Sequence, residues 1–331
     1  MKDSAVLLID CPDRKGLVAR VSSLLYERGA NILHADQHQD HDLGLFFMRV
    51  EWALNTALNT PIETSVDASV DTPAEDLDGQ VGSPVGPAAG PTAGQASSPA
   101  SSPDTFDLEG FRSAFAPLAA ELRMRWNLSS SARKPKVALF CSQYLHCMAD
   151  LLHRWRTGEL CCEIPVIVSN HRDVEKLAEF YGIPFEFVPV GVRERDGAEA
   201  RQLEILESKE VELVVLARYM QILTSSFVAR YPAAIINVHH SFLPAFTGAK
   251  PYHAAHARGV KLIGATSHYV TELLDDGPII EQDVARISHR DQVEDLVARG
   301  RDLERIVLAR AVRWHLDRRI LCYGNKTVVF D

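Results

Sequence analysis

The chain has 331 residues, of which 46% are hydrophobic, so it is long enough for about two domains with buried cores. Its formal net charge of -9 and pI near 5.8 give no overall basic surface, which argues against nucleic-acid binding and favours chemistry on a small molecule. No apolar run approaches the roughly 18 residues that span a bilayer, and the first residues lack a signal-peptide pattern. We therefore expect a cytoplasmic protein without a membrane segment.

The first part of the chain predicts a small domain of the order βαββαβ. Its helical segments carry apolar residues at helical spacing, and Gly29 is placed to end the first of them. A polar turn is expected at residues 38–42, between the second and third strands. The predicted elements are strand 5–9, helix 16–28, strands 32–39 and 44–52, helix 108–122 and strand 124–128.

A composition shift interrupts this domain at residues 53–104. The segment is rich in Ala, Pro, Ser, Thr and Gly, and it contains no Lys or Arg. Such a sequence has too few aliphatic residues to build a core, so we expect a disordered acidic insertion. The domain is then formed by residues 1–52 and 105–130. A simple spacer is the favoured interpretation, and a docking segment is the alternative.

The order βαββαβ, together with the sequence DCPDRKGLVARVSSLLYERGANI, resembles the ACT domain, a regulatory module that binds amino acids at dimer interfaces. The resemblance implies an amino-acid effector and a homo-oligomer. Asp13, Gly16 and Asn31 are the loop and turn positions that it places nearest the effector. The same residue types also serve helix capping and turn geometry, so both interpretations stay open.

The second domain is expected over residues 135–331, where strands and helices alternate. Alternation of this kind predicts a Rossmann-like parallel sheet with helices on its faces, and the continuously apolar strands VALF, PVIVS and LVVLA suit burial on both faces. The predicted elements are strands 137–140, 164–169, 185–189, 213–217 and 235–238, helices 147–156, 174–181, 199–208 and 252–258, a strand pair at 265–270 and 279–287, and a helix at 292–316.

The turn after VALF reads CSQYLHCMADLL and has neither GxGxxG nor GxxxxGK[ST]. The backbone cradle that holds a nucleotide phosphate is therefore missing. NAD and ATP are not expected, and no cofactor is predicted.

Catalytic chemistry is expected where the strand at 235–238 ends. Asn237 and His239 would lie at a strand's carboxyl end, where open α/β sheets bind ligands, and Asp275 precedes Gly277 and Pro278 in a turn. An amide, an imidazole and a carboxylate suit acyl transfer to water, because the oxyanion needs a donor and the water needs a base. Each residue alone also suits a structural cap or turn.

Metal hydrolysis is the rival interpretation. The chain supplies enough ligands for zinc, but no HExxH or comparable spacing, so we predict no metal. The six cysteines likewise show no CxxC pair and are expected to be free thiols. The ligands considered were His239, His240, His253, His256, His268, Asp275 and Asp276.

The run from INVHH to DDGPII is similar to the formyltransferase-fold enzymes that use 10-formyltetrahydrofolate, and more closely to the formyltetrahydrofolate deformylases. The features shared with the latter are the leading ACT-like domain, the HC pair at residues 146–147, LLHRWRTGEL, LARYMQIL, the doubled histidine and GNKTVVF. The resemblance implies that Asn237, His239 and Asp275 are catalytic, with His268 as a supporting imidazole.

The same resemblance implies the folate site. The folate substrate would lie against Arg218, Met220, Ile222, Leu223 and Val270. The apolar residues among them also suit an ordinary core at a strand end, and Arg218 suits either a ligand carboxylate or a surface ion pair.

The implied activity is hydrolysis of 10-formyltetrahydrofolate to formate and tetrahydrofolate, which would balance one-carbon pools and supply formate for purine synthesis. The chain departs from the deformylase pattern at Gln143 and Leu145 and at residues 191–197, which puts local substrate contacts in doubt. The glycine-rich phosphate loop of glycinamide ribonucleotide transformylases is absent. Two alternatives remain, namely formyl transfer to an amine acceptor and an inactive amino-acid-sensing regulator.

Overall fold

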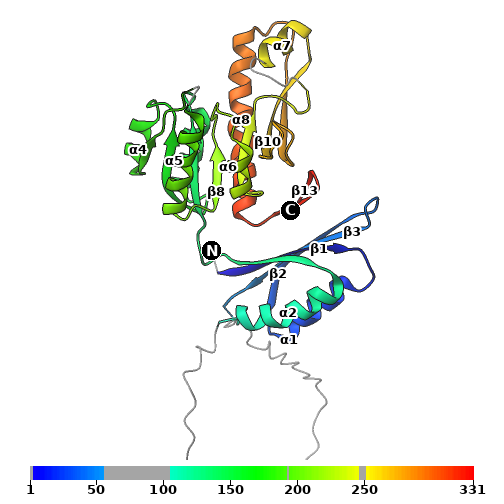
Figure 1. The fold of residues 1–331 in the computed structure, drawn as a ribbon. Coiled ribbons are helices and arrows are strands. Elements are labelled where there is room, and N and C mark those ends of the chain that lie inside the picture. The colour runs from blue at the N-terminus through cyan, green and yellow to red at the C-terminus, as the bar shows by residue number, and fades with distance from the viewer. Residues whose placement is uncertain (1–2, 56–104, 192–193, 246–250) are drawn as a thin grey trace, which may run out of the picture.

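The structure, a computed structural model, describes residues 3–55, 105–191, 194–245 and 251–331. Two domains lie one above the other, and the chain passes once between them before its carboxyl end returns to the first domain (Figure 1). The predicted insertion falls outside the described residues except for its first three. Among these, Ala53 ends a strand and Asn55 forms an isolated bridge with Thr105, so the two ends of the insertion lie together.

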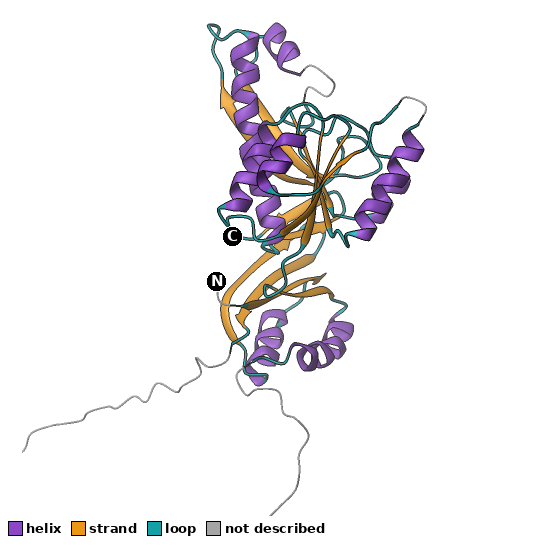
Figure 2. Cartoon of the chain, turned by 90° about the vertical axis from the view of Figure 1, so that its left-hand side faces the viewer, coloured by secondary structure: helices purple, strands orange, loops and turns teal. Residues whose placement is uncertain are grey.

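The amino-terminal domain has the predicted order βαββαβ. Its sheet is antiparallel with strand order β2-β3-β1-β4. Both helices cover the face that points away from the second domain (Figure 2), and their apolar sides bury a core around Leu7, Val21, Phe111 and Phe115. The elements are β1 (Ser4–Pro12), α1 (Leu17–Glu27), β2 (Asn31–Asp40), β3 (Leu45–Ala53), α2 (Leu108–Leu122) and β4 (Arg125–Ser130).

Local sequence signals account for the carboxyl end of α1 and the amino end of α2. Gly29 takes a left-handed φ of 75° after α1, and the amide of Ala30 reaches back to the carbonyl of Leu25 at 2.9 Å. The carboxylate of Asp107 caps α2 by accepting from the amide of Gly110 at 2.9 Å. The turn between β2 and β3 lies at residues 41–44 and not at 38–42, because β2 is an exposed edge strand whose polar residues continue the ladder.

The second domain is a seven-stranded sheet of order β11-β10-β9-β8-β5-β6-β7 with helices on both faces. Five strands are parallel, whereas β10 runs antiparallel to β9, and β11 to β10. The elements are β5 (Lys136–Cys141), α3 (His146–Arg156), β6 (Glu163–Ser169), α4 (Glu175–Tyr181), β7 (Phe185–Phe187), α5 (Arg195–Ser208), β8 (Leu213–Leu216), α6 (Ser225–Arg230), β9 (Ile235–His239), α7 (Pro251–Arg258), β10 (Leu262–Tyr269), β11 (Ile279–Arg286), α8 (Val293–Leu316), β12 (Ile320–Tyr323) and β13 (Lys326–Val329).

Two features of this domain were not predicted. The short helix α6 begins after Thr224, whose hydroxyl accepts from the amide of Phe227, and six residues are too few to show a helical period. The hairpin β12–β13 follows the long helix α8 as a separate two-stranded sheet. No helix in the described part of the chain is long and apolar enough to cross a bilayer.

The hairpin β12–β13 joins the two domains. Tyr323 and Val328 of the hairpin and Phe330, which follows it, are buried in one cluster with side chains on the open face of the amino-terminal sheet, among them Phe47. Polar contacts border this cluster. Arg49, only 5% exposed, donates to the carbonyl oxygens of residues 318 and 317 at 3.1 and 3.2 Å, and the Tyr323 hydroxyl lies 3.2 Å from an Asp40 carboxylate oxygen.

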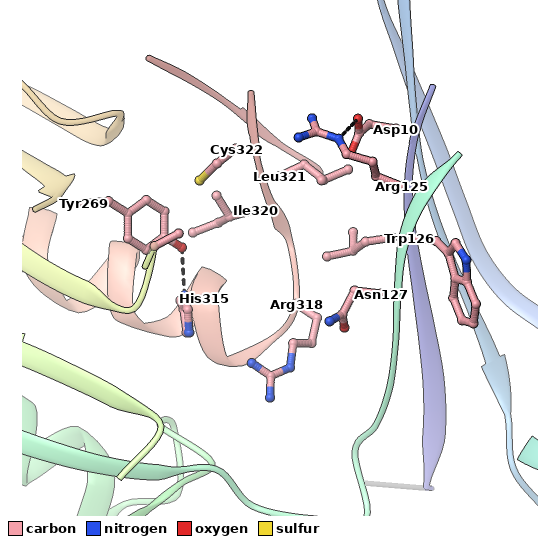
Figure 3. Close-up of a pocket in the computed structure, with 12 residues that line it drawn as sticks. Asp10, Arg125, Trp126, Asn127, Tyr269, His315, Arg318, Ile320, Leu321 and Cys322 are labelled. Carbon is pink, nitrogen blue, oxygen red and sulfur yellow. Dashed lines mark hydrogen bonds and ion pairs between the residues drawn. The ribbon is translucent and has the colours of Figure 1, made fainter. Parts of the chain in front are cut away.

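A cavity of about 340 Å³ remains beside this interface (Figure 3). Arg125 and Asp10 form an ion pair of 2.8 Å on its amino-terminal side. On the other side the hydroxyl of Tyr269 lies 2.7 Å from Nδ1 of His315. Burial, reinforced by the nearby charge of Arg318, lowers the pKa of His315 to about 3, so this imidazole is neutral at physiological pH.

Candidate active site

The predicted catalytic residues meet at the carboxyl end of β9. Asn237 and His239 lie two positions apart on this strand and therefore face the same side of the sheet. The antiparallel register pairs Asn237 with His268 of β10, and the Asn237 side-chain nitrogen lies 3.3 Å from His268 Nε2. All three border a pocket of about 640 Å³, which is large enough for a cofactor-sized ligand.

Asp275 reaches the same place from the loop between β10 and β11. Its Oδ2 lies 3.3 Å from His239 Nδ1, and its Oδ1 lies 3.8 Å from His268 Nε2. The residue has a left-handed φ of 55°, which is uncommon outside glycine and is tolerated best by Asn and Asp. Gly277 lets the loop close, because a Cβ at this position would lie 1.7 Å from the carbonyl oxygen of Tyr269.

Hydrogen bonding fixes the protonation pattern of the group. His268 Nδ1 donates to the carbonyl oxygen of Tyr269 at 2.9 Å, and burial lowers the pKa of His268, so Nε2 remains available to accept from Asn237. The hydrogen bond with His239 lowers the pKa of Asp275, which is ionised at neutral pH. The buried Nε2 of His239 has no hydrogen-bond partner among the described residues. An unsatisfied buried nitrogen is costly, so this atom marks where a ligand would bind.

The predicted folate-contacting residues line the same pocket. Met220 and Ile222 are 50% and 56% exposed, so they are not core residues in this structure. Leu223 follows them in the loop after β8, and Val270 borders the pocket from the loop after β10. Leu273 and Leu274 are similarly exposed on the opposite loop and were not predicted individually.

Arg218 also borders the pocket, but its guanidinium already contacts three side chains of the protein. Its Nε lies 3.4 Å from Oε2 of Glu304, its Nη1 lies 2.5 Å from His240 Nδ1, and the Tyr144 ring covers it at 5.2 Å. The side chain is 12% exposed. The alternative of a surface ion pair does not describe this buried arrangement, and contact of Arg218 with a ligand carboxylate stays a prediction.

Sequence reasoning did not single out Glu304. This glutamate is 1% exposed and lies in α8 among the buried residues Leu303, Val307 and Leu308. A charged residue on the apolar face of a long helix was the signal that could have found it, because buried carboxylates need partners. Its partner Arg218 is distant in sequence, so the reason for the burial required the fold.

The residues considered for a rival zinc site lie in different places, because His239, His268 and Asp275 belong to the group described above. His253 and His256 are exposed on α7. Among the described residues, the group with metal-ligand spacing is instead His146, Cys147 and Glu304, whose ligand atoms lie within 4.8 Å of one another. Burial raises the pKa of Cys147 well above its ordinary value, and Glu304 already faces a guanidinium, so neither donor is prepared for a cation.

The predicted effector residues separate into two places. Asp13 and Gly16 line a second pocket, of about 940 Å³, between the start of α1 and the end of β2. Gly16 has a φ of 87° there, and Asp13 accepts from the Gln39 side chain at 3.2 Å. Asn31 begins β2 and pairs with Ala53, at the opposite end of that strand, so it does not border this pocket.

Comparison with known proteins gives the same architecture. The Formyl transferase family matches residues 135–312, and the ACT domain matches residues 5–51. The fold and the site thus define a formyl transferase domain preceded by an ACT domain, as predicted.

The similarity extends over the whole chain. A formyltetrahydrofolate deformylase of Synechocystis sp. is 46% identical over 99% of this chain and 98% of its own length, and that of Bacillus subtilis is 43% identical over 100% and 95%. The crystal structure of a formyltetrahydrofolate deformylase from Pseudomonas syringae pv. tomato has a TM-score of 0.84 at 44% identity, covering 100% of this chain and 95% of that one. The chain belongs to the formyltetrahydrofolate deformylase family.

Proposed function

We propose that this protein hydrolyses 10-formyltetrahydrofolate to formate and tetrahydrofolate. The observation that carries the proposal is the meeting of Asn237, His239, His268 and Asp275 at one pocket, with His239 Nε2 buried and unpaired among the described residues. Full-length similarity to the deformylases supports the same reaction.

The reaction divides naturally among these residues. Asp275 orients a water molecule and accepts its proton as the water oxygen bonds to the formyl carbon. The amide of Asn237 and protonated His239 donate to the oxyanion that forms, and the contact of Asp275 with His239 Nδ1 orients that ring. The intermediate then breaks its bond to N10, which takes a proton from His239 or from solvent. Formic acid leaves and ionises to formate, and Asp275 releases the proton that it took from water.

The remainder of the pocket suits the folate. Its exposed apolar side chains, Met220 and Ile222 on one loop and Leu273 and Leu274 on the other, offer two walls between which a flat ring system can stack. The loop with Met220 and Ile222 follows β8 at the carboxyl end of the parallel strands. The other loop follows the antiparallel strand β10 and returns to the same pocket, where its Asp275 meets His239.

Water is the proposed acceptor of the formyl group. In the loop after β5, the Ser142 hydroxyl donates to Asn170 at 2.7 Å and accepts from the amide of Met220 at 3.0 Å. These polar groups are therefore used within the protein and do not form a free phosphate cradle. Transfer to an amine is the second candidate, because the crystal structure of a glycinamide ribonucleotide transformylase from Symbiobacterium toebii shares the fold over 60% of this chain, with a TM-score of 0.57 at 28% identity.

The test is formate release by purified protein from 10-formyltetrahydrofolate, without added amine and in the presence of EDTA, compared with Asp275→Asn. We expect the native rate to be unaffected by EDTA and the variant to lose about 10²- to 10⁴-fold, the range of general-base catalysis. Turnover only after an amine is supplied would instead identify a transferase, and no turnover at all would favour an inactive regulator. Loss of activity on metal removal would overturn the metal-free mechanism.

We further propose that the amino-terminal domain binds an amino acid in the pocket of Asp13 and Gly16 and pairs with a second copy. The edge strand β2 supports pairing, because it is exposed and carries Ile32 and Leu33 at 38% and 52% exposure. Sedimentation velocity with and without single amino acids measures both properties, and a monomer unaffected by any of them would contradict the proposal.

The physiological role that we propose is to return tetrahydrofolate to the one-carbon pool and to supply formate for purine synthesis. A cytoplasmic location is proposed with it. All six cysteines are free, as expected in a reducing compartment.

A further inference from the structure

A buried polar network connects α8 with the catalytic histidine. It begins at the carboxylate of Glu304. The hydroxyl of Tyr252 donates to Oε1 at 2.8 Å, and His146 Nε2 lies 2.8 Å from Oε2. Arg218 Nε lies 3.4 Å from the same Oε2, a distance that makes an ion pair.

The charge of Glu304 is maintained by these partners. Burial alone raises the pKa of this carboxyl group, but the hydrogen bond from His146 and the charge of Arg218 together outweigh it and lower the pKa below its ordinary value. Glu304 is therefore a buried anion, and Arg218 is its buried counter-ion. Their side chains are only 2% and 12% exposed, so water can replace neither partner well.

Arg218 in turn orients His240, whose ring stacks on that of His239. A guanidinium can only donate hydrogen bonds, so His240 Nδ1 must accept from Arg218 Nη1, and a neutral His240 carries its proton on Nε2. The ring held in this way lies parallel to that of His239, with centroids 5.0 Å apart and an interplanar angle of 10°. His239 is thus fixed on one face by His240 and at Nδ1 by Asp275.

We propose that Glu304 is a positioning residue for the reaction, which acts through Arg218 and His240 to hold His239 Nε2 at the formyl oxygen. The inference rests on the proposed hydrolysis. Without the carboxylate, Arg218 loses its counter-ion and turns towards the open pocket. His240 then loses its donor, and the ring of His239 is no longer held in the orientation in which Asp275 accepts a hydrogen bond from its Nδ1.

Glu304→Gln is the principal test, because it keeps the shape of the side chain and removes its charge. A displacement of about 1 Å at a reacting group can cost about 10²-fold in rate, so we expect kcat to fall about 100-fold. KM should change by less than about threefold, because the apolar walls around Met220 and Leu273 remain in place.

Tyr252→Phe is the matched control. It removes a hydrogen bond from the other oxygen of the same carboxylate and leaves the ion pair with Arg218 intact. Both variants should lose stability in urea, but Tyr252→Phe should keep kcat within about threefold. Equal losses of kcat in the two variants, in proportion to their losses of stability, would mean that Glu304 is only structural and would overturn the inference.

A measurement on the native protein decides the case if Glu304→Gln does not fold. The ¹⁵N shifts of the histidine rings distinguish a protonated ring nitrogen from an accepting one. We expect Nδ1 of His240 to be the acceptor, and a proton found on this atom would overturn the inference. This measurement needs no turnover. Absence of formate release by the native protein would therefore count against the proposed function alone, while the ring shifts would still decide the position of His240.

Discussion

The tight loop that carries Asp275 makes Gly277→Ala a sensitive perturbation of the site. A Cβ at residue 277 would lie 1.7 Å from the carbonyl oxygen of Tyr269 and 2.9 Å from its carbonyl carbon. Since such contacts do not fall below 3.0 Å, the two segments must separate by at least about 1.3 Å. Tyr269 is buried at the end of β10, and its carbonyl accepts from His268, so we expect the loop to move.

Movement of the loop displaces Asp275, which lies two residues before Gly277 and only 3.3 Å from His239. A shift of this size predicts a loss of about 10²-fold or more in kcat/KM for formate release. The far-ultraviolet circular dichroism should stay close to native, because β10 and β11 continue to pair.

Gly197→Ala is the control for this experiment. Its added Cβ meets nothing within 4 Å, and residue 197 lies in α5, where alanine is favoured over glycine by about 0.5–1 kcal/mol. This variant should keep full activity and gain slight stability. A Gly277→Ala protein with native kcat/KM would refute the argument that backbone contact at Tyr269 determines the position of Asp275.

Two further predictions concern stability. The pKa of His315 is lowered from 6.5 to about 3 by burial, so the unfolded chain binds one more proton than the folded one between these pH values. The free energy of unfolding should therefore fall as pH drops through this window, by at most about 2 kcal/mol at pH 5. Urea titrations should show a weaker pH dependence for His315→Asn than for the native protein. Equal pH dependence in the two proteins would contradict this assignment. Phe330 is 1% exposed at the domain interface, so Phe330→Ala should lower the free energy of unfolding by about 3–5 kcal/mol. Phe180 is 73% exposed, so Phe180→Ala should change this free energy by no more than about 0.5 kcal/mol. Similar effects of the two substitutions would show that the contact of Phe330 with the amino-terminal domain is not stabilising.

Much of the fold could be predicted from the sequence because its signals are local. The helix α2 has the predicted bounds, since Asp107 caps it and its aromatic residues repeat with helical spacing. The polar edge strand β2 was placed less well at its end, because a strand that is exposed on both faces has no burial pattern to mark where it stops. The hairpin β12–β13 could not be foreseen, since two strands are stable only against a partner surface, and that surface belongs to the other domain.

In the candidate site too, local sequence signals predicted some residues, whereas others could be found only from tertiary packing. Asn237 and His239 were found because a strand end and a family motif mark them, and the register with β10 then explains why His268 joins them. Asn31 was grouped with Asp13 on the resemblance to the ACT domain, but it begins the ten-residue strand β2, whose other end borders the pocket of Asp13. Glu304 and Arg218 are far apart in sequence, so only tertiary packing could reveal their pairing.

The return of the carboxyl-terminal hairpin to the first domain changes how the protein can be divided. A fragment cut at the covalent boundary, before β5, would retain Tyr323, Val328 and Phe330 but lose the sheet that covers them. The amino-terminal fragment would expose Phe47 in the same way, and it would leave Arg49 without the carbonyl groups that accept its hydrogen bonds. The unit that can be expressed alone is therefore not the unit that a linker in the sequence suggests. Each fragment would expose the apolar side chains of the broken interface, and we expect the two fragments to reassociate when they are mixed.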